Sequence, residues 1–268
     1  MKCPVVIEYK MQKRPLAYFI GVFFIIVYCP FIYAHSVVEQ VARLKPSVVG
    51  VGLYDALAAQ KHQLRGTGFA FGDGSLIATN HHVLAAQLDP VVVQYHIVMV
   101  GTGAHPQVYR ARVLAQDLTY DIAILKIDTQ LKPVKLADDT MRADGTEVLI
   151  TGFPIGAVLG LYPATHKGII AASTPDIIPT INSNQLTTER LVKLKNPYLV
   201  YQLDITAYPG NSGSPLYSAE NGEVVGILNK VFVQDSKESL LEKPSGISYA
   251  IPVKYLRELA QRHNLIQR

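Results

Sequence analysis

The hexapeptide at positions 210–215 is the part of the sequence best suited to expose a reactive hydroxyl. It reads Gly-Asn-Ser-Gly-Ser-Pro, so that Ser212 lies inside a glycine-bracketed turn that ends in proline. Glycine adopts backbone angles closed to other residues, and a sharp bend beside Ser212 can point backbone N–H groups at an oxyanion. The expected donors are the N–H groups of Gly210 and Ser212, with Asn211 as a further candidate. Alone, the hexapeptide is more typical of a solvated turn.

A serine hydroxyl becomes a nucleophile only when a positioned base removes its proton. Upstream, His82 lies in a Thr-Asn-His-His-Val segment, and Asp121 opens the apolar run 122–127. We assign Ser212 as nucleophile and His82 as the general base that returns the proton to the leaving amine. Asp121 would fix the tautomer and orientation of His82. The order His, Asp, Ser is that of chymotrypsin-like proteases and differs from the order in subtilisins and α/β-hydrolases.

Five segments in this order resemble the protease domain of the HtrA/Deg family. They are 66–69, 79–83, 121–127, 210–216 and 246–253. The resemblance implies a chymotrypsin-like fold of two six-stranded β-barrels and serine endopeptidase activity. It places the base directly before Val83, which selects His82 over His81. It also places the acid in an Asp-Ile-Ala pattern, which selects Asp121 and makes Asp117 a solvated turn residue.

The same resemblance indicates which residues would meet a substrate. Thr206, six positions before the nucleophile, would form the base of the S1 pocket and carries no charge, so cleavage after Lys or Arg is not expected. The strand containing Ile227, Leu228 and Asn229 would pair with an extended substrate as an added strand. Glutamyl endopeptidases share the serine hexapeptide but have histidine where Leu228 stands. We therefore expect a small or medium apolar P1 residue, and Tyr208 either narrows the pocket or packs at the core edge.

Composition and charge narrow the class of protein further. Of the formal charge of +4 on 268 residues, the segment 1–34 contributes +3, which leaves +1 for the remainder. Nearly neutral charge gives no electrostatic indication of nucleic-acid binding. Cys3 and Cys29 are the only cysteines, so positions 35–268 offer no disulfide, thiol nucleophile or cysteine metal site. The sequence has no metal-ligand spacing, phosphate loop or dinucleotide fingerprint, and no cofactor is expected.

The N-terminal segment has the features of an export signal. Basic residues precede the apolar stretch 16–33, and Ile-Tyr-Ala at 32–34 is an imperfect cleavage site. These features predict a signal peptide over 1–34. An uncleaved anchor is the alternative, because the apolar stretch approaches the length that spans a bilayer. Both interpretations export the folded domain 35–268 to the bacterial periplasm or beyond, with membrane attachment only if the leader is uncleaved.

Apolar spacing predicts the secondary structure that must carry these residues. Residues 36–45 have helical spacing with Ser36 as N-cap, and 253–264 form a second helix packed on the second barrel. Between them, short β-branched runs separated by turn residues predict an all-β protein. The first barrel, about 47–135, and the second, about 146–252, would contain strands at 48–53, 68–71, 76–79, 91–100, 109–117 and 122–127, and at 147–152, 166–173, 199–203, 215–217, 223–229 and 247–251.

Two departures from the family pattern leave alternatives open. The sequence stops after the second helix, where HtrA proteases usually continue into PDZ domains, so no PDZ domain is expected. The segment 174–197 is either a solvated loop or a regulatory, substrate-contacting loop. The expected substrates are unfolded or extended polypeptides. The alternative function is a latent or non-cleaving binding or chaperone module that needs an activator. The helix 36–45 could support a homo-oligomer or pack on its own barrel.

Overall fold

The computed structural model describes residues 36–84, 88–89, 91–103, 105–154, 160–176, 197–231 and 246–267. All of them belong to one compact unit, His35–Arg268. The predicted leader 1–34 lies outside the described residues, as does nearly all of the segment 174–197. Within the described residues, no helix has both the length and the apolar character needed to cross a membrane.

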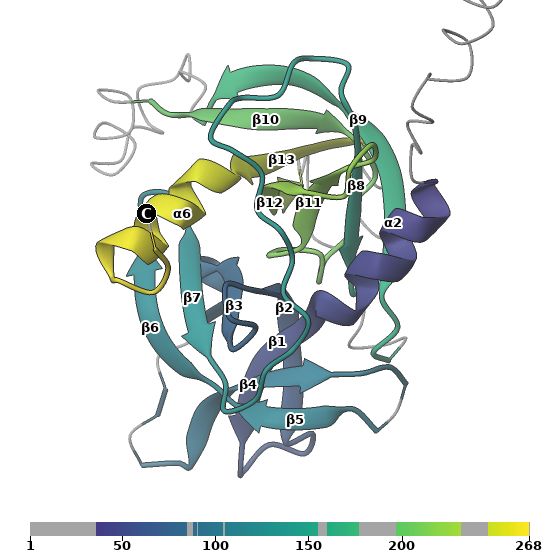
Figure 1. Ribbon diagram of the computed structural model, residues 1–268. Coiled ribbons are helices and arrows are strands. Elements are labelled where there is room, and N and C mark those ends of the chain that lie inside the picture. The colour runs from purple at the N-terminus through teal and green to yellow at the C-terminus, as the bar shows by residue number, and fades with distance from the viewer. Residues whose placement is uncertain are drawn as a thin grey trace, which may run out of the picture. The chain divides into compact units, whose positions relative to one another are not determined.

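Seven strands form the first sheet, in the order β5-β4-β1-β2-β3-β7-β6 (Figure 1). Its two edge strands are consecutive in sequence and are separated only by Ala111, whose N–H donates to the His96 carbonyl oxygen at 2.9 Å. One bent stretch of chain thus joins both edges, and the sheet forms the first barrel as an open sheet of seven strands, where six were predicted. The strands are β1 (Val48–Asp55), β2 (His62–Phe71), β3 (Leu76–Asn80), β4 (Gln94–Val100), β5 (Gln107–Arg110), β6 (Arg112–Asp117) and β7 (Ile122–Lys126).

Three differences from the predicted strand boundaries in this barrel exceed two residues or change the number of strands. The single strand expected at 109–117 is two strands, because the chain bends at Ala111 to change partners from β4 to β7. β2 begins at His62 rather than at position 68, since its polar first half still pairs with β1. β4 begins at Gln94 and not at 91. Val91 is 91% exposed, so its side chain does not pack against the sheet.

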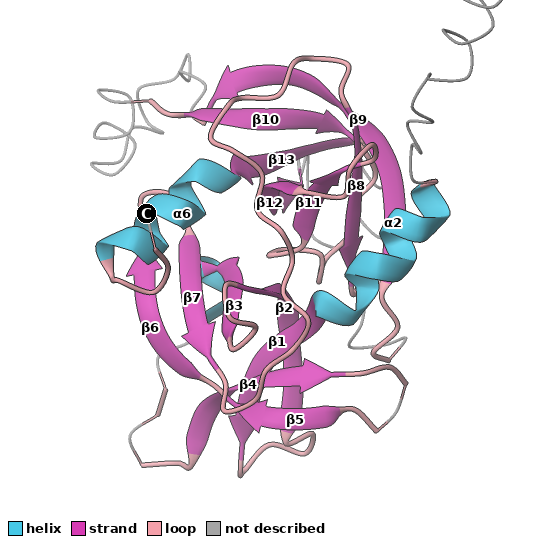
Figure 2. Cartoon of the chain, in the orientation of Figure 1, coloured by secondary structure: helices cyan, strands magenta, loops and turns pink. Residues whose placement is uncertain are grey.

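Six strands close the second barrel, in the order β10-β13-β12-β11-β8-β9. Inside it, the buried Thr151 hydroxyl lies 2.8 Å from the Thr165 hydroxyl and 2.7 Å from that of Tyr217. These contacts satisfy polar groups that would otherwise be costly to bury. The strands are β8 (Glu147–Gly152), β9 (Ala164–Pro175), β10 (Leu199–Asp204), β11 (Pro215–Ser218), β12 (Val224–Val231) and β13 (Ile247–Pro252). The all-β, two-barrel architecture is confirmed (Figure 2).

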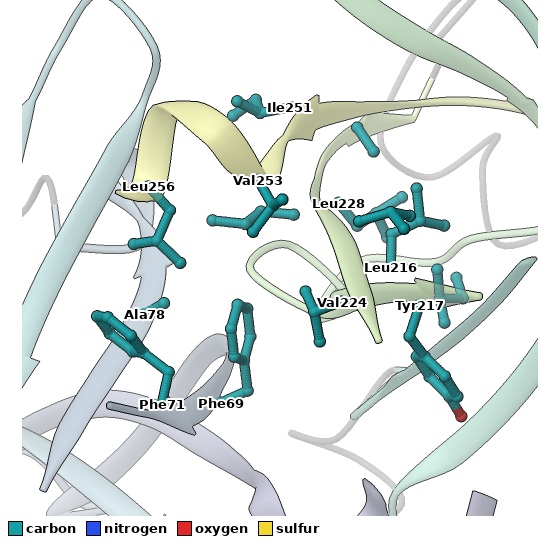
Figure 3. Packing of buried hydrophobic residues seen from close by; sticks show 14 of the residues in the cluster. Phe69, Phe71, Ala78, Leu216, Tyr217, Val224, Leu228, Ile251, Val253 and Leu256 are labelled. Atoms are coloured by element: carbon teal, nitrogen blue, oxygen red, sulfur yellow. The ribbon is translucent and has the colours of Figure 1, made fainter. Parts of the chain in front are cut away.

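One hydrophobic cluster joins the two barrels. Phe69 and Phe71 of β2 are fully buried and belong to the same cluster as Val224 and Leu256 from the second half of the chain. Figure 3 shows the two phenylalanine rings turned toward these aliphatic side chains. Burying such side chains contributes roughly 1.5–3 kcal/mol each. Residues on facing edges of the two barrels are therefore held in a fixed relation.

A helix lies at each end of the described chain. In α2 (Val37–Leu44), Ser36 and Glu39 form the predicted N-cap as a reciprocal capping box, and the 3-10 turn η1 (Lys45–Ser47) follows. The Gln40 side chain donates to the Glu220 carbonyl oxygen at 3.1 Å, so α2 packs against the turn between β11 and β12. The second helix, α6 (Val253–Arg262), contacts strands of both barrels and ends before the predicted position 264. There the chain turns at Asn264, which has a left-handed φ of 54°.

Candidate active site

The predicted general base lies on a short turn that Asp121 holds in place. His81 and His82 begin the 3-10 turn η2 (His81–Leu84), which directly follows β3. The His81 N–H and the Asn80 side-chain amide both donate to the Asp121 carbonyl oxygen, at 3.1 Å each. Asp121 has a φ of 53°, a left-handed conformation that aspartate tolerates better than most residues. This conformation lets its backbone and its carboxylate contact the same turn.

The carboxylate of Asp121 binds His82 through both oxygens. Oδ1 accepts the His82 backbone N–H at 2.8 Å, and Oδ2 lies 2.6 Å from His82 Nδ1. A proton on Nδ1 between these two groups leaves Nε2 free to accept another proton. Burial raises the pKa of the Asp121 carboxyl, but hydrogen bonds and charge interaction with His82 outweigh it and hold the pKa below its ordinary value. The carboxylate is thus charged when it orients the imidazole.

Asn229 has a side-chain role beyond the substrate pairing that was predicted for its strand. The predicted pairing involves the backbone of its strand, while the side chain is turned inward: the residue is only 7% exposed, and its side-chain amide donates to Asp121 Oδ2 at 2.8 Å. This bond also lowers the pKa of the carboxyl. Asn229 therefore supports the acid from the opposite barrel. The available signal was an amide side chain directly after the apolar run 224–228.

The glycine-bracketed turn has the backbone conformation that the sequence indicated. Gly210 and Gly213 have φ values of 99° and 87°, which favour glycine. The Asn211 N–H, expected as a further oxyanion donor, instead donates to the Tyr208 carbonyl oxygen at 3.0 Å. Among the described residues, the N–H groups of Gly210 and Ser212 have no backbone acceptor. These two donors are the ones available to a negatively charged oxygen.

The Ser212 hydroxyl lies between the two barrels. Its Oγ donates to the Asn229 carbonyl oxygen at 3.3 Å, a long hydrogen bond at the point where the register of β12 shifts between Leu228 and Lys230. Asn229 thus contacts both ends of the site, accepting from Ser212 with its backbone and donating to Asp121 with its side chain. Transfer of the hydroxyl proton to His82 needs the Ser212 Oγ to rotate away from this carbonyl. Such contacts commonly tighten only when substrate is bound.

His81 and Asp117, which were rejected as general base and acid, differ in environment from His82 and Asp121. The His81 ring has a buried Nδ1 without a hydrogen-bond partner among the described residues. Asp117 was expected to be a solvated turn residue, but its side chain is only 11% exposed. Its Oδ1 accepts the Tyr120 N–H at 3.1 Å, and its Oδ2 lies 2.5 Å from Arg262. Asp117 therefore anchors the loop before Asp121 to helix α6 and is committed to these partners.

The other predicted specificity residues differ in exposure. Ile227 and Leu228 are 0% and 1% exposed, so their side chains belong to the core and only their backbone can meet a substrate. Thr206 and Tyr208 are half-buried, and the Tyr208 ring centroid lies 6.0 Å from that of His166. Within the described ranges, no group of three His, Cys, Asp or Glu side chains is arranged to hold a metal ion.

Comparisons with known proteins identify the family of this chain. Residues 66–227 match the model of the trypsin-like peptidase domain. A probable periplasmic serine endoprotease, DegP-like, from Pseudomonas putida is 30% identical over 192 residues, which are 71% of this chain and 33% of that protein. Serine protease HTRA1A from Danio rerio is 30% identical over 241 residues, 87% of this chain and 42% of that protein. The chain thus spans well under half the length of these relatives.

Solved structures extend the likeness to three dimensions. The serine endoprotease from Yersinia pestis aligns with a TM-score of 0.60 and 26% identity, over 85% of this chain and 66% of that one. The HtrA-type protease AlgW with a decapeptide aligns with a TM-score of 0.63 and 24% identity, over 86% of this chain and 68% of that one. At 24% identity, the likeness to AlgW concerns the fold alone.

Proposed function

Since this chain belongs to the trypsin-like peptidase family and is HtrA-like in sequence and fold, we propose that it is an exported serine endopeptidase. The observation that carries the proposal is the contact of 2.6 Å between Asp121 Oδ2 and His82 Nδ1. This pair supplies an oriented base across the barrel interface from a serine on a glycine-bracketed turn. Ser212, His82 and Asp121 would act as nucleophile, general base and orienting acid.

The reaction would proceed through an acyl-enzyme. Ser212 Oγ attacks the substrate carbonyl carbon while its proton passes to His82 Nε2, and the carbonyl oxygen becomes an oxyanion. The N–H groups of Gly210 and Ser212 stabilise that oxygen. His82 then gives its proton to the leaving amine as the C–N bond breaks. A water activated by His82 hydrolyses the ester and restores the Ser212 hydroxyl.

The substrate would be an unfolded or extended polypeptide. Substrate backbone would pair with β12 near Leu228 and Asn229 as an added strand, a mode that requires an extended chain. The buried side chains of β12 leave the backbone as its contribution to recognition. The uncharged Thr206 supports a small or medium apolar P1 residue.

The cellular setting is proposed from the N-terminal sequence and the relatives. The basic and apolar composition of 1–34 supports export, and the DegP-like relatives are named as periplasmic. Two roles were expected for the first helix, packing on its own barrel or supporting a homo-oligomer. The contact of α2 with the turn between β11 and β12 supports the first role. A homo-oligomer would need contacts beyond this one.

Labelling with a fluorophosphonate probe tests the proposed activity. Phosphonylation of Ser212 requires both the base and the oxyanion donors, so Ser212→Ala and His82→Ala should abolish labelling. His81→Ala is the matched control, because it removes the neighbouring imidazole, and it should label at nearly the wild-type rate. Labelling that survives Ser212→Ala, or that depends on His81 instead of His82, would contradict the assignment.

One observation favours a second function, a latent or non-cleaving binding module. The Ser212 hydroxyl donates to the Asn229 carbonyl oxygen, and in that orientation it is not activated by His82. A ligand that bound only the rotated form would shift the population toward activity. Wild-type protein that is folded but unlabelled, and that labels once an extended peptide is added, would establish this alternative.

A further inference from the structure

The turn that carries the nucleophile rests directly on strand β2 of the other barrel. The Thr67 backbone N–H donates to the Ser212 carbonyl oxygen at 2.8 Å, and the Thr67 hydroxyl donates to the Gly210 carbonyl oxygen at 2.7 Å. Thr67 is completely buried, and 143 residues separate it from Gly210. A single side chain from the first barrel thus contacts the backbone on which both oxyanion donors depend.

The Thr67 hydroxyl has a defined orientation. Its Oγ1 accepts the Phe153 N–H at 3.1 Å, so its own proton is directed to the Gly210 carbonyl oxygen. The Thr67 carbonyl oxygen in turn accepts the Thr79 hydroxyl at 2.7 Å, three residues before His82. The two bonds that share Thr67 Oγ1 polarise and strengthen one another. Thr67 thus connects β3 and Phe153, which follows β8, with the nucleophile turn.

The contact fixes one peptide plane in particular. The peptide between Gly210 and Asn211 has its C=O bound by Thr67 and its N–H bound by the Tyr208 carbonyl oxygen. Both ends of the plane are therefore held, and the N–H groups of Gly210 and Ser212 flank it. Gly210 has a φ of 99° and no side chain, so it could rotate easily if the plane were released.

The packing around Thr67 leaves no room for a side chain at the neighbouring glycines. A Cβ on Gly213 would lie 2.0 Å from the Thr67 carbonyl oxygen, and a Cβ on Gly152 would lie 3.0 Å from Thr67 Oγ1. A Cβ on Gly66 would lie 2.9 Å from the Ser212 carbonyl oxygen. The backbones of β2 and of the nucleophile turn are thus in direct contact.

We propose that Thr67 is a positioning residue, whose hydroxyl locks the Gly210–Asn211 peptide and so holds the two oxyanion donors in place. The inference rests on the proposed peptidase function and adds a residue that acts through the backbone without touching substrate. Loss of the hydroxyl should impair the chemical step more than substrate binding, since the oxyanion forms only in the reaction.

The test is Thr67→Val in the full chain, with Thr67→Ser as the conservative rescue. Thr151→Val is the matched control, because Thr151 is equally buried and hydrogen-bonded but lies inside the second barrel. Removing one oxyanion donor lowers kcat by about 10²–10³-fold, and a loosened turn should lower it by about 10–100-fold. For Thr67→Val we expect that decrease with KM within about twofold, and for Thr67→Ser a recovery to within about threefold.

Amide hydrogen exchange of Asn211 separates this inference from the proposed function. Its N–H should exchange faster in Thr67→Val than in Thr151→Val, whether or not the protein cleaves peptides. An unlabelled wild type with this faster exchange would reject the peptidase proposal and retain the locking role. Equal kcat and equal Asn211 exchange in the two valine variants would overturn the inference. If Thr67→Val does not fold, Thr67→Cys, whose thiol is a weak donor, gives the same comparison.

Discussion

Replacing Asp121 by asparagine removes the charge that orients His82 without straining the backbone. Asparagine adopts the left-handed φ of 53° as readily as aspartate, so the turn should keep its shape. The new amide can face its neighbours in two ways. With its NH₂ at the Oδ1 position it meets the His82 N–H, and with its NH₂ at the Oδ2 position it meets the Asn229 amide.

In either orientation, the new NH₂ group and a neighbouring N–H donor face each other. The loss of one acceptor sets the cost in stability. One donor that is buried or partly buried loses its acceptor, which lowers the free energy of unfolding by about 1–3 kcal/mol. The second orientation also presents NH₂ to His82 Nδ1 and so favours the wrong imidazole tautomer. A loss of this kind lowers kcat by about 10⁴-fold in a serine protease with this arrangement.

The two effects can be separated by exchanging the residues. In the double variant Asp121→Asn with Asn229→Asp, the amide at 121 again has an acceptor at 229, so stability should recover by about 1 kcal/mol or more. The rate of peptide hydrolysis should stay low, since no carboxylate holds His82 Nδ1 in its original place. Chemical denaturation measures the first quantity and steady-state kinetics the second. A kcat within about tenfold of wild type for Asp121→Asn would refute the orienting role.

Three further predictions concern other parts of the fold. Gly213→Ala should abolish probe labelling and lower stability, because the new Cβ would lie 2.0 Å from a carbonyl oxygen of β2; unchanged labelling would show that the turn can yield. Gln40→Ala should lower the free energy of unfolding by about 1–3 kcal/mol, against less than about 0.5 for the exposed Val38→Ala, as measured in urea. Burial lowers the pKa of His166, so the folded state binds fewer protons than the unfolded state below about pH 6.5 and stability falls there on acidification. His166→Gln should flatten that fall in pH-dependent thermal unfolding, and an unchanged slope would exclude this histidine as its source.

Features set by neighbouring residues were predictable from the sequence. The cap at Ser36 depends on Glu39 three positions later, and the capping box has this spacing. The glycine conformations at Gly210 and Gly213 likewise follow from the local motif. The two-barrel fold follows from short β-branched runs and from the family resemblance.

Features set by contacts between distant parts of the sequence were not predictable. Asn229 reaches Asp121 over 108 residues, and no local pattern marks an amide as a partner for an acid. Thr67 reads as part of a glycine-rich motif, yet its role depends on a carbonyl oxygen in another barrel. The bend at Ala111 has neither glycine nor proline beside it, so only the change of partner strand produces it.

The division of the site between the barrels has a consequence for the protein during its own synthesis. His82 and Asp121 belong to the first half of the chain, while Ser212 and Asn229 belong to the second. A nascent chain with only its first barrel folded has an oriented base and no nucleophile, and an undocked second barrel has an unactivated hydroxyl. The proposed peptidase chemistry would therefore require both barrels to be folded and docked, so incompletely folded copies would be harmless to one another.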